Sequence, residues 1–492
     1  MDALILVDAP CGPILGQRDE TGCRFLGIPY ARPPLGDRRF AAPEARERFS
    51  APWEAFAYGP AAPQKRALPQ PIGSFMAAVR RFDEDCLSLN VWTPATDGAR
   101  PVLVFIHGGG FIIGSSAQYP GADLAVRGDV VVVTINYRLG LLGFNGFAEL
   151  YPDDPRFAAN AGLLDQALAL QWIRTNIAAF GGDPDRVTLA GESAGAASVA
   201  FHLVHRPSWP LFNRAILQSG GLNMFWSRRE AVEVAADVVT ALDADAEPGR
   251  LFSLPAAAFS RVLRKLGKTQ MGILARPYLD GIQVPERPLR ELYALAKPVP
   301  LLVGTTRDEF SLFSDLSLFP IQSDLTSLSG WAERVAGASR AAEIAQLYPE
   351  TREGRIAFGT DILFRMPAVH FADLHAERAP AFCYRLDWPV KGLLNRLGAT
   401  HSVDLPLLFD DFVKRFRSLY LGLLADPKRR ALSTRMKAHW LSFVRDGRPG
   451  EDWPVYEPLR RETMIFNEVD RIQSDPEGNR RPAWDGVDHF VV

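Results

Sequence analysis

The chain has 492 residues, of which 47% are hydrophobic and 23% are charged, as in a globular protein with a large buried core. Its formal net charge of -2, without a run of lysines and arginines, argues against a nucleic-acid partner. No segment approaches the roughly 20 apolar residues of a membrane helix, and residues 1–10 lack the features of a signal peptide. We therefore expect a cytoplasmic protein that does not associate with membranes.

From about residue 100, short apolar runs alternate with helix-like segments, which is typical of a mostly parallel sheet covered by helices on both faces. A helix is expected at residues 163–178. Further helical patterns in 225–295 and 312–375 predict insertions that form a cap or regulatory element. Because no repeat or linker separates these parts, we expect one α/β domain over residues 1–492. The predicted strands are 101–106, 129–135, 187–190, 215–217, 300–303 and 381–386.

A glycine-rich segment, His107-Gly108-Gly109-Gly110-Phe111, follows the first predicted strand. Consecutive glycines let backbone N–H groups approach an oxyanion without interference from a Cβ atom. The alternatives are a flexible turn or a phosphate-binding loop, but the sequence motifs of phosphate loops do not follow here. We expect the N–H groups of Gly109 and Gly110, with that of Ala194, to donate to an oxyanion.

The strongest local motif is Gly191-Glu192-Ser193-Ala194-Gly195, which lies between the predicted strand 187–190 and a helix-like run at 196–204. A serine on such a strand-to-helix turn needs small residues two positions away on either side. Chance alone produces G-x-S-x-G in roughly one chain in five of this length, so the flanking strand and helix carry the inference. They predict that Ser193 is a nucleophile.

The remaining catalytic groups are expected to follow the serine in the order acid, then histidine. His401 lies in a loop after the last predicted strand, where a general base could reach Ser193. Four other histidines lie in helical patterns or at the terminus and are expected to be packed or solvated: His370, His375, His439 and His489. Asp308 and Glu309 both follow the strand 300–303, and either carboxylate could orient the imidazole on this evidence alone.

The four cysteines lie far apart without a C-x-x-C spacing, which favours buried free thiols over a zinc site or a disulfide framework. The sequence suggests no metal and no cofactor. The cysteines are Cys11, Cys23, Cys86 and Cys383.

With these residues in view, the chain resembles the type-B carboxylesterases, the cholinesterase-like branch of the α/β-hydrolases that includes bacterial nitrobenzyl esterases. Coverage is nearly end to end. The motifs that carry the resemblance are Phe-Leu-Gly-Ile-Pro-Tyr-Ala at 25–31, Asn-Tyr-Arg-Leu-Gly at 136–140, Asn-Ala-Gly-Leu-Leu-Asp-Gln at 160–166, and the segment 180–195 around the serine.

The resemblance implies an α/β-hydrolase fold and selects Glu309 as the acid, since the family's glutamate stands in a G-x-x-x-x-E-G motif that here begins at Gly304. Phe310 replaces the final glycine. The resemblance also implies that Glu192 and Ser219 shape the hydrogen bonds around His401, with Asp404 where the family usually has glutamate.

At two places the sequence departs from the family, and these differences argue against the disulfide of the secreted members and against cholinesterase activity. The secreted members pair the cysteine corresponding to Cys86 with one in a G-P-x-C-P-Q segment, but residues 59–64 have alanine there, so that disulfide cannot form. The loop 64–83 holds no tryptophan, and we therefore do not expect cholinesterase activity.

These observations predict a hydrolase that uses a Ser-His-Glu triad and an acyl-enzyme to cleave small to medium apolar or aryl esters, and carbamates as further candidates. Phe111, Phe310 and Phe313 are expected near the substrate. The alternatives are an acyltransferase or eliminase with the same triad, and a non-catalytic binding protein, which the presence of all three triad residues disfavours. The expected partner is a small-molecule ester, and the chain is expected to be a monomer or a homodimer.

Overall fold

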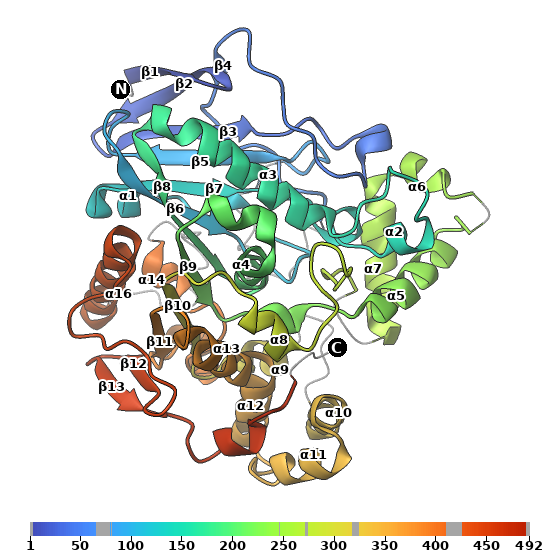
Figure 1. The fold of residues 1–492 in the computed structure, drawn as a ribbon, viewed down its shortest axis with the longest axis vertical. Coiled ribbons are helices and arrows are strands. Elements are labelled where there is room, and N and C mark those ends of the chain that lie inside the picture. The colour runs from blue at the N-terminus through green and yellow to red at the C-terminus, as the bar shows by residue number, and fades with distance from the viewer. Residues whose placement is uncertain are drawn as a thin grey trace. The chain divides into compact units, whose positions relative to one another are not determined.

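The computed structural model describes residues 3–64, 79, 81–245, 247–270, 274–316, 324–409 and 426–488. Within them the chain forms a thirteen-stranded mixed sheet with helices, so the predicted α/β class is confirmed (Figure 1). The strand order is β1-β2-β3-β5-β7-β6-β8-β9-β10-β11-β12-β13, with β4 paired to β2. The strands are β1 Ala3–Ala9, β2 Gly12–Asp19, β3 Gly22–Pro29, β4 Trp53–Glu54, β5 Ser88–Thr93, β6 Arg100–Ile106, β7 Val131–Ile135, β8 Gly182–Glu192, β9 Arg214–Gln218, β10 Leu301–Thr306, β11 Ala381–Leu386, β12 Glu462–Phe466 and β13 Arg471–Ser474.

The described helices include the one predicted at 163–178, which runs two residues earlier at each end as α3. A π-helical turn at Asp361–Arg365 joins α12 to α13. The α-helices are α1 Ala122–Gly128, α2 Phe147–Leu150, α3 Ala161–Asn176, α4 Ala194–Val204, α5 Arg228–Ala241, α6 Arg250–Ser253, α7 Ala256–Gln270, α8 Leu289–Ala294, α9 Ser311–Leu316, α10 Leu325–Ala336, α11 Ala338–Ala345, α12 Arg352–Thr360, α13 Met366–Ala376, α14 Leu405–Leu408 and α16 Pro427–Asp446.

The chain divides into two compact units. The first comprises residues 1–189, 207–213 and 226–286, and the second comprises 190–206, 214–225 and 287–492. The predicted insertion 225–295 contains α5 to α8, and the described part of 312–375 contains α10 to α13. That these helices cap a site, and that the whole chain acts as one domain, stays a prediction.

The first unit begins with strands that the sequence pattern does not predict. β1, β2, β3 and β5 pair antiparallel in that order, and β5 then pairs antiparallel with β7. β1 buries only alternate residues near its end, whereas all of β7 is buried. Continuous apolar runs reveal a strand that is covered on both faces, while half-exposed strands give a weaker signal.

A buried ion pair inside the first unit joins two of the sequence motifs. Arg138 Nη2 lies 2.6 Å from Asp165 Oδ1, and Arg138 Nε donates to Asp165 Oδ2 at 2.8 Å. Asp165 also accepts from the Arg138 backbone N–H at 3.0 Å. Since both side chains are almost fully buried, each charge depends on the other for compensation.

The second unit supplies the parallel strands whose carboxyl ends lead to the candidate site. β9, β10, β11 and β12 pair parallel in that order, and β13 closes the edge antiparallel to β12. All residues of β10 are buried. The carboxyl ends of parallel strands meet at one edge, which is where ligands of such sheets bind.

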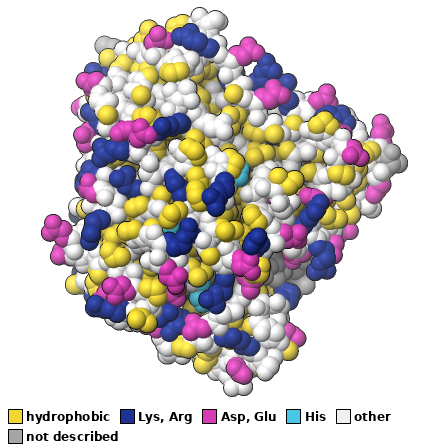
Figure 2. Space-filling model, viewed as in Figure 1, with side chains coloured by type: hydrophobic (Ala, Val, Ile, Leu, Met, Phe, Trp, Pro, Cys, Tyr) yellow, Lys and Arg dark blue, Asp and Glu magenta, His cyan; other side chains and the backbone are white. Residues whose placement is uncertain are grey.

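The surface and the cysteines agree with a plain globular protein. On the face shown in Figure 2, lysine and arginine side chains lie interspersed with aspartate and glutamate. In the described part of the chain, none of the helices has the length and apolarity to cross a bilayer. All four cysteines are free; three are buried and Cys11 is partly buried.

The burial of the Arg138–Asp165 pair predicts how much its loss lowers the free energy of unfolding. Asp165→Asn leaves the guanidinium buried without a counter-charge, and we expect it to lower the free energy of unfolding by about 3–5 kcal/mol. The matched control is Asp123→Asn, which removes the exposed partner of Arg127 and is expected to cost less than about 1 kcal/mol. Urea unfolding followed by tryptophan fluorescence measures both, and equal losses would contradict the prediction.

Candidate active site

Ser193 lies on a sharp turn between β8 and α4. Its backbone has φ 57° and ψ -122°, a conformation that costs a non-glycine residue on the order of 1–3 kcal/mol. Two hydrogen bonds hold the turn: the Ser193 N–H donates to Gln218 O of β9 (2.8 Å), and Ala197 N–H donates to Ser193 O (3.0 Å). A Cβ atom on Gly191 would lie 2.4 Å from the Gly195 carbonyl group, so the close crossing of strand and helix requires glycine. The strand-to-helix turn expected from the motif is present.

The imidazole of His401 lies between two buried carboxylates. Glu309 Oε2 is 2.6 Å from Nδ1, and Glu192 Oε1 is 3.3 Å from Nε2. All three residues expose less than a twentieth of their surface. The structure therefore brings His401 together with the acid selected by the resemblance and with the residue next to Ser193.

The structure separates the two carboxylates that follow β10. Glu309 turns toward His401, while its other oxygen accepts from the Thr306 backbone N–H at 2.7 Å. Asp308 instead pairs with Arg307 and accepts from the Ala399 backbone N–H at 2.8 Å. Asp308 thus ties the loop that leads to His401, and Glu309 contacts the imidazole itself.

Ser402 is a site residue that the sequence reasoning missed. Its hydroxyl donates to Glu192 Oε1 at 2.5 Å, the same oxygen that faces His401 Nε2. Ser402 adopts φ 65°, in the left-handed region that non-glycine residues rarely occupy. This backbone conformation directs its hydroxyl toward Glu192. The only signal in the sequence was its place directly after the candidate histidine.

Asp404 belongs to the same buried cluster. Its Oδ2 accepts from Gln218 Nε2 at 2.6 Å and from the Tyr384 hydroxyl at 3.3 Å. Ser219, which the resemblance places in this network, is buried, and its hydroxyl has no hydrogen-bond partner among the described residues. The neighbouring Gln218 makes the contact to the cluster instead.

Burial and charge shift the pKa values of this cluster. Burial lowers the pKa of His401, but the charges of Glu192 and Glu309 outweigh it and raise that pKa from 6.5 to about 9. Burial raises the pKa of the Glu192 carboxyl, although His401 opposes the shift. Burial likewise raises the pKa of Asp404. The pKa of each of these groups therefore depends on the charge of its neighbours.

The described residues include no hydrogen bond between Ser193 and His401. Ser193 is partly buried, and its hydroxyl has no partner among them, while His401 Nε2 faces Glu192. Since Glu192 directly precedes Ser193 in the chain, the imidazole is held next to the serine turn.

The first unit carries the glycine-rich segment after β6. Gly109 and Gly110 have φ 114° and 60°, and a Cβ atom on Gly109 would lie 2.1 Å from Ile113 O. Neither glycine N–H donates to an acceptor in the described ranges, and neither does the Ala194 N–H in the second unit. Unused N–H groups are what an oxyanion needs. That the three converge on one oxyanion stays a prediction.

The three phenylalanines expected near the substrate have different surroundings. Phe313 lies with its ring centroid 5.3 Å from that of His401, and Phe364, which the sequence reasoning missed, lies at 5.0 Å. Phe310 is fully buried and packs on the Gly359 backbone of α12. Phe111, in the first unit, packs on Phe144 at 4.8 Å. Two aromatic rings, stacked on each other with their centroids 5.9 Å apart, therefore pack against the imidazole in the second unit.

Comparison with known proteins gives a consistent set of relatives. The model of the Carboxylesterase family matches residues 4–484. Para-nitrobenzyl esterase of Bacillus subtilis (strain 168) is 36% identical over 97% of this chain and 97% of that protein. Phenmedipham hydrolase of Pseudarthrobacter oxydans is 33% identical over 88% of this chain and 89% of that protein.

Solved structures agree with the sequence matches. A structure of PNB esterase superposes with a TM-score of 0.87 and 35% identity, and it covers 97% of this chain and 99% of the other. A carboxylesterase of Geobacillus stearothermophilus superposes with a TM-score of 0.82 at 33% identity, with the same coverage.

The two carboxylates at His401 make a prediction about its pKa. Glu192→Gln removes one of the two negative charges that raise this pKa, so we expect the imidazole to titrate at a lower pH than in the unchanged protein. NMR titration of the histidine-labelled protein measures it, with the His401 signal assigned by its loss in His401→Asn.

The matched control for this titration is Asp308→Asn, which removes a carboxylate that faces the Ala399 N–H and not the imidazole. We expect it to leave the pKa of His401 near that of the unchanged protein. A His401 signal that titrates identically in the Glu192→Gln protein would show that Glu192 does not act on the imidazole.

Proposed function

Because the chain belongs to the Carboxylesterase family, we propose that it hydrolyses carboxylic esters through a covalent acyl intermediate on Ser193, with His401 as general base and Glu309 as its orienting acid. The observation that carries this assignment is the 2.6 Å contact between Glu309 and His401 Nδ1, beside the strained turn of Ser193. A base oriented by a buried acid is the arrangement that activates a serine.

In the first half of the reaction, His401 Nε2 takes the proton of the Ser193 hydroxyl as its oxygen attacks the ester carbonyl carbon. Glu309 keeps the Nδ1–H in place and stabilises the imidazolium that forms. The imidazolium then gives its proton to the departing alcohol, which leaves the acyl group on Ser193. In the second half, His401 takes a proton from water as the water oxygen attacks the acyl carbon, and it then gives that proton to the Ser193 oxygen as the carboxylic acid leaves.

Backbone N–H groups stabilise the negative oxygen in both halves of this mechanism. The proposed donors are Gly109, Gly110 and Ala194, whose N–H groups are unused among the described residues. Loss of one such donor from a water-excluded site typically costs on the order of 100-fold or more in rate.

Glu192 controls whether His401 Nε2 is available as a base. With Nε2 facing Glu192 at 3.3 Å, the imidazole must release this contact to accept the serine proton. Burial raises the pKa of the Glu192 carboxyl and the charge of His401 opposes that shift, so the protonation of each group depends on the other. We propose that Ser402, through its hydrogen bond to Glu192, fixes the carboxyl while the imidazole moves.

The proposed substrates are small to medium esters with an apolar or aryl part, and aryl carbamates. Phe313 and Phe364, which stack on each other beside the imidazole, offer apolar surface for such groups. The name of the Pseudarthrobacter oxydans relative describes a phenmedipham hydrolase, which supports including carbamates. No observation favours the acyltransferase, eliminase or binding-protein alternatives over hydrolysis.

Ester hydrolysis by Ser193 predicts a burst of p-nitrophenol from p-nitrophenyl acetate and butyrate, followed by steady turnover. Ser193→Ala is expected to lower kcat by on the order of 10⁵-fold, since it removes the nucleophile. The matched control, Ser442→Ala on α16, removes a hydroxyl that donates only to Arg448 O and should leave the rate unchanged. Equal turnover by the Ser193→Ala protein would refute the assignment.

The carbamate proposal predicts slow carbamoylation of the same serine. Incubation with p-nitrophenyl N-methylcarbamate should release p-nitrophenol once per chain and abolish esterase activity, which then recovers as water removes the carbamoyl group. Intact mass spectrometry should find the adduct on the unchanged protein and not on Ser193→Ala. A protein that turns over esters but forms no adduct would limit the substrates to esters.

A further inference from the structure

A cavity of about 440 Å³ lies inside the second unit and is lined by an unusual number of arginines. Its wall includes the segment 306–308, directly before Glu309, but neither Ser193 nor His401. Its volume falls within the roughly 300–1,000 Å³ of small-molecule sites. The arginines in its wall are Arg307, Arg352, Arg365, Arg385, Arg396 and Arg480.

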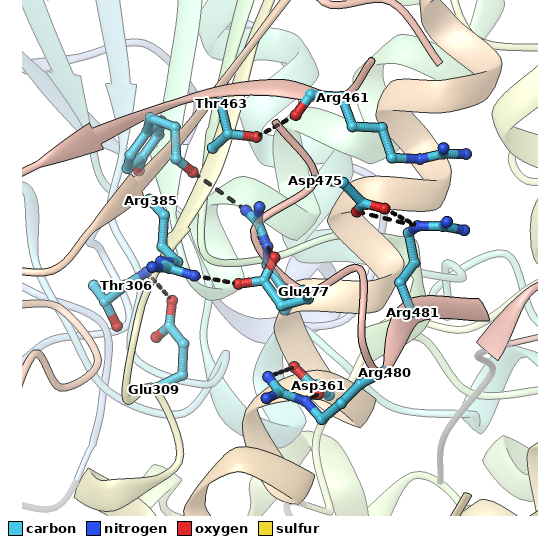
Figure 3. A network of polar contacts seen from close by, with 12 residues as sticks. Thr306, Glu309, Asp361, Arg385, Arg461, Thr463, Asp475, Glu477, Arg480 and Arg481 are labelled. Carbon is cyan, nitrogen blue, oxygen red and sulfur yellow. Dashed lines mark hydrogen bonds and ion pairs between the residues drawn. The ribbon is translucent and has the colours of Figure 1, made fainter. Parts of the chain in front are cut away.

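Carboxylates hold these arginines in fixed positions. Arg480 Nε donates to Asp361 at 2.7 Å, and Glu477 accepts from both Arg365 (2.8 Å) and Arg385 (2.5 Å), as Figure 3 shows for the labelled pairs. The wall contains six guanidinium groups and four carboxylates. Two further carboxylates outside the wall also pair with its arginines: Asp315 with Arg352, and Asp387 with Arg385. The pairs orient the guanidinium groups without using all of their donors.

Several guanidinium nitrogens in the wall remain unused. Arg307 uses Nε and Nη2 on Asp308, and Arg480 uses Nε and Nη2 on Asp361. The Nη1 atoms of both arginines have no acceptor among the described residues, and neither has Nη2 of Arg365. Each guanidinium has five N–H donors in a rigid fork, so these nitrogens can bind an oxyanion without releasing their carboxylates.

We propose that this cavity binds the phosphate group of a small molecule, with the spare N–H donors of Arg307, Arg365 and Arg480 as its contacts. Guanidinium groups and hydroxyls are the side chains that recognise phosphate oxygens. The cavity is much larger than one phosphate, and Ile356, Ala357 and Leu397 in its wall offer apolar surface to a carbon skeleton. This binding site lies outside the proposed ester chemistry and does not depend on it.

Isothermal titration calorimetry of the full chain tests the proposal with two probes, inorganic phosphate and glucose 6-phosphate, each against chloride at matched ionic strength. We expect one saturable site. Arg480→Gln should weaken binding about tenfold, since it removes a hydrogen-bond donor to a charged ligand. Arg460→Gln, which changes an exposed arginine outside the wall, is the control and should bind as the unchanged protein does. Binding that persists in Ser193→Ala separates this result from the ester proposal.

A second variant covers the case in which Arg480→Gln does not fold, since Arg480 pairs with the buried Asp361. Arg307→Gln removes an unused donor at the partly exposed side of the cavity and should also weaken binding.

The two probes distinguish the sources of the phosphate group. Tighter binding of glucose 6-phosphate supports a phosphorylated metabolite, while equal binding of the two probes supports free phosphate in the same site. Absence of binding by both probes would overturn the proposal. It would also be overturned by binding that neither Arg480→Gln nor Arg307→Gln weakens.

Discussion

The buried imidazole of His401 is the interaction on which the candidate active site depends, because a carboxylate lies against each of its nitrogens. A carboxylate in a protein interior is costly unless a charge or hydrogen bond compensates it. Glu309 and Glu192 both obtain that compensation from the same ring. The ring in turn keeps a raised pKa because of them. Removing any one of the three would leave the others without the partner that makes their burial tolerable.

The parallel strands of the second unit explain why residues so distant in sequence meet. β8 ends at Glu192, β9 ends at Gln218, and β10 ends three residues before Glu309. His401 follows β11 through a longer connection. Since β9, β10 and β11 run in the same direction, their carboxyl ends deliver these side chains to one edge of the sheet. The backbone bond from Ser193 to Gln218 O fixes the serine turn to the same edge.

The segment 306–309 links the candidate site with the arginine-lined cavity. The Thr306 N–H holds Glu309, and Thr306 belongs to the wall of the cavity. Asp308 is also in the cavity wall and binds the Ala399 N–H, two residues before His401. The acid and the histidine of the proposed triad are thus positioned by backbone contacts whose other side faces the proposed phosphate site. The hydrogen bonds of the segment 306–309 thus hold the Glu309 carboxylate in place for its contact with His401.

The sequence by itself determined the features that depend on neighbouring residues. The strand-to-helix turn at Ser193 follows from the glycines two positions away, and the buried parallel strands follow from continuous apolar runs. Only the tertiary structure decided which carboxylate after β10 meets the imidazole in space, where the resemblance had selected Glu309. It also revealed Ser402 and the antiparallel strands β1, β2, β3 and β5, of which β1 is largely exposed and gives a weak pattern. Thr306 and Arg480 both line the cavity although they lie far apart in the sequence. No pattern of neighbouring residues predicts that they meet, because the cavity exists only once the chain has packed.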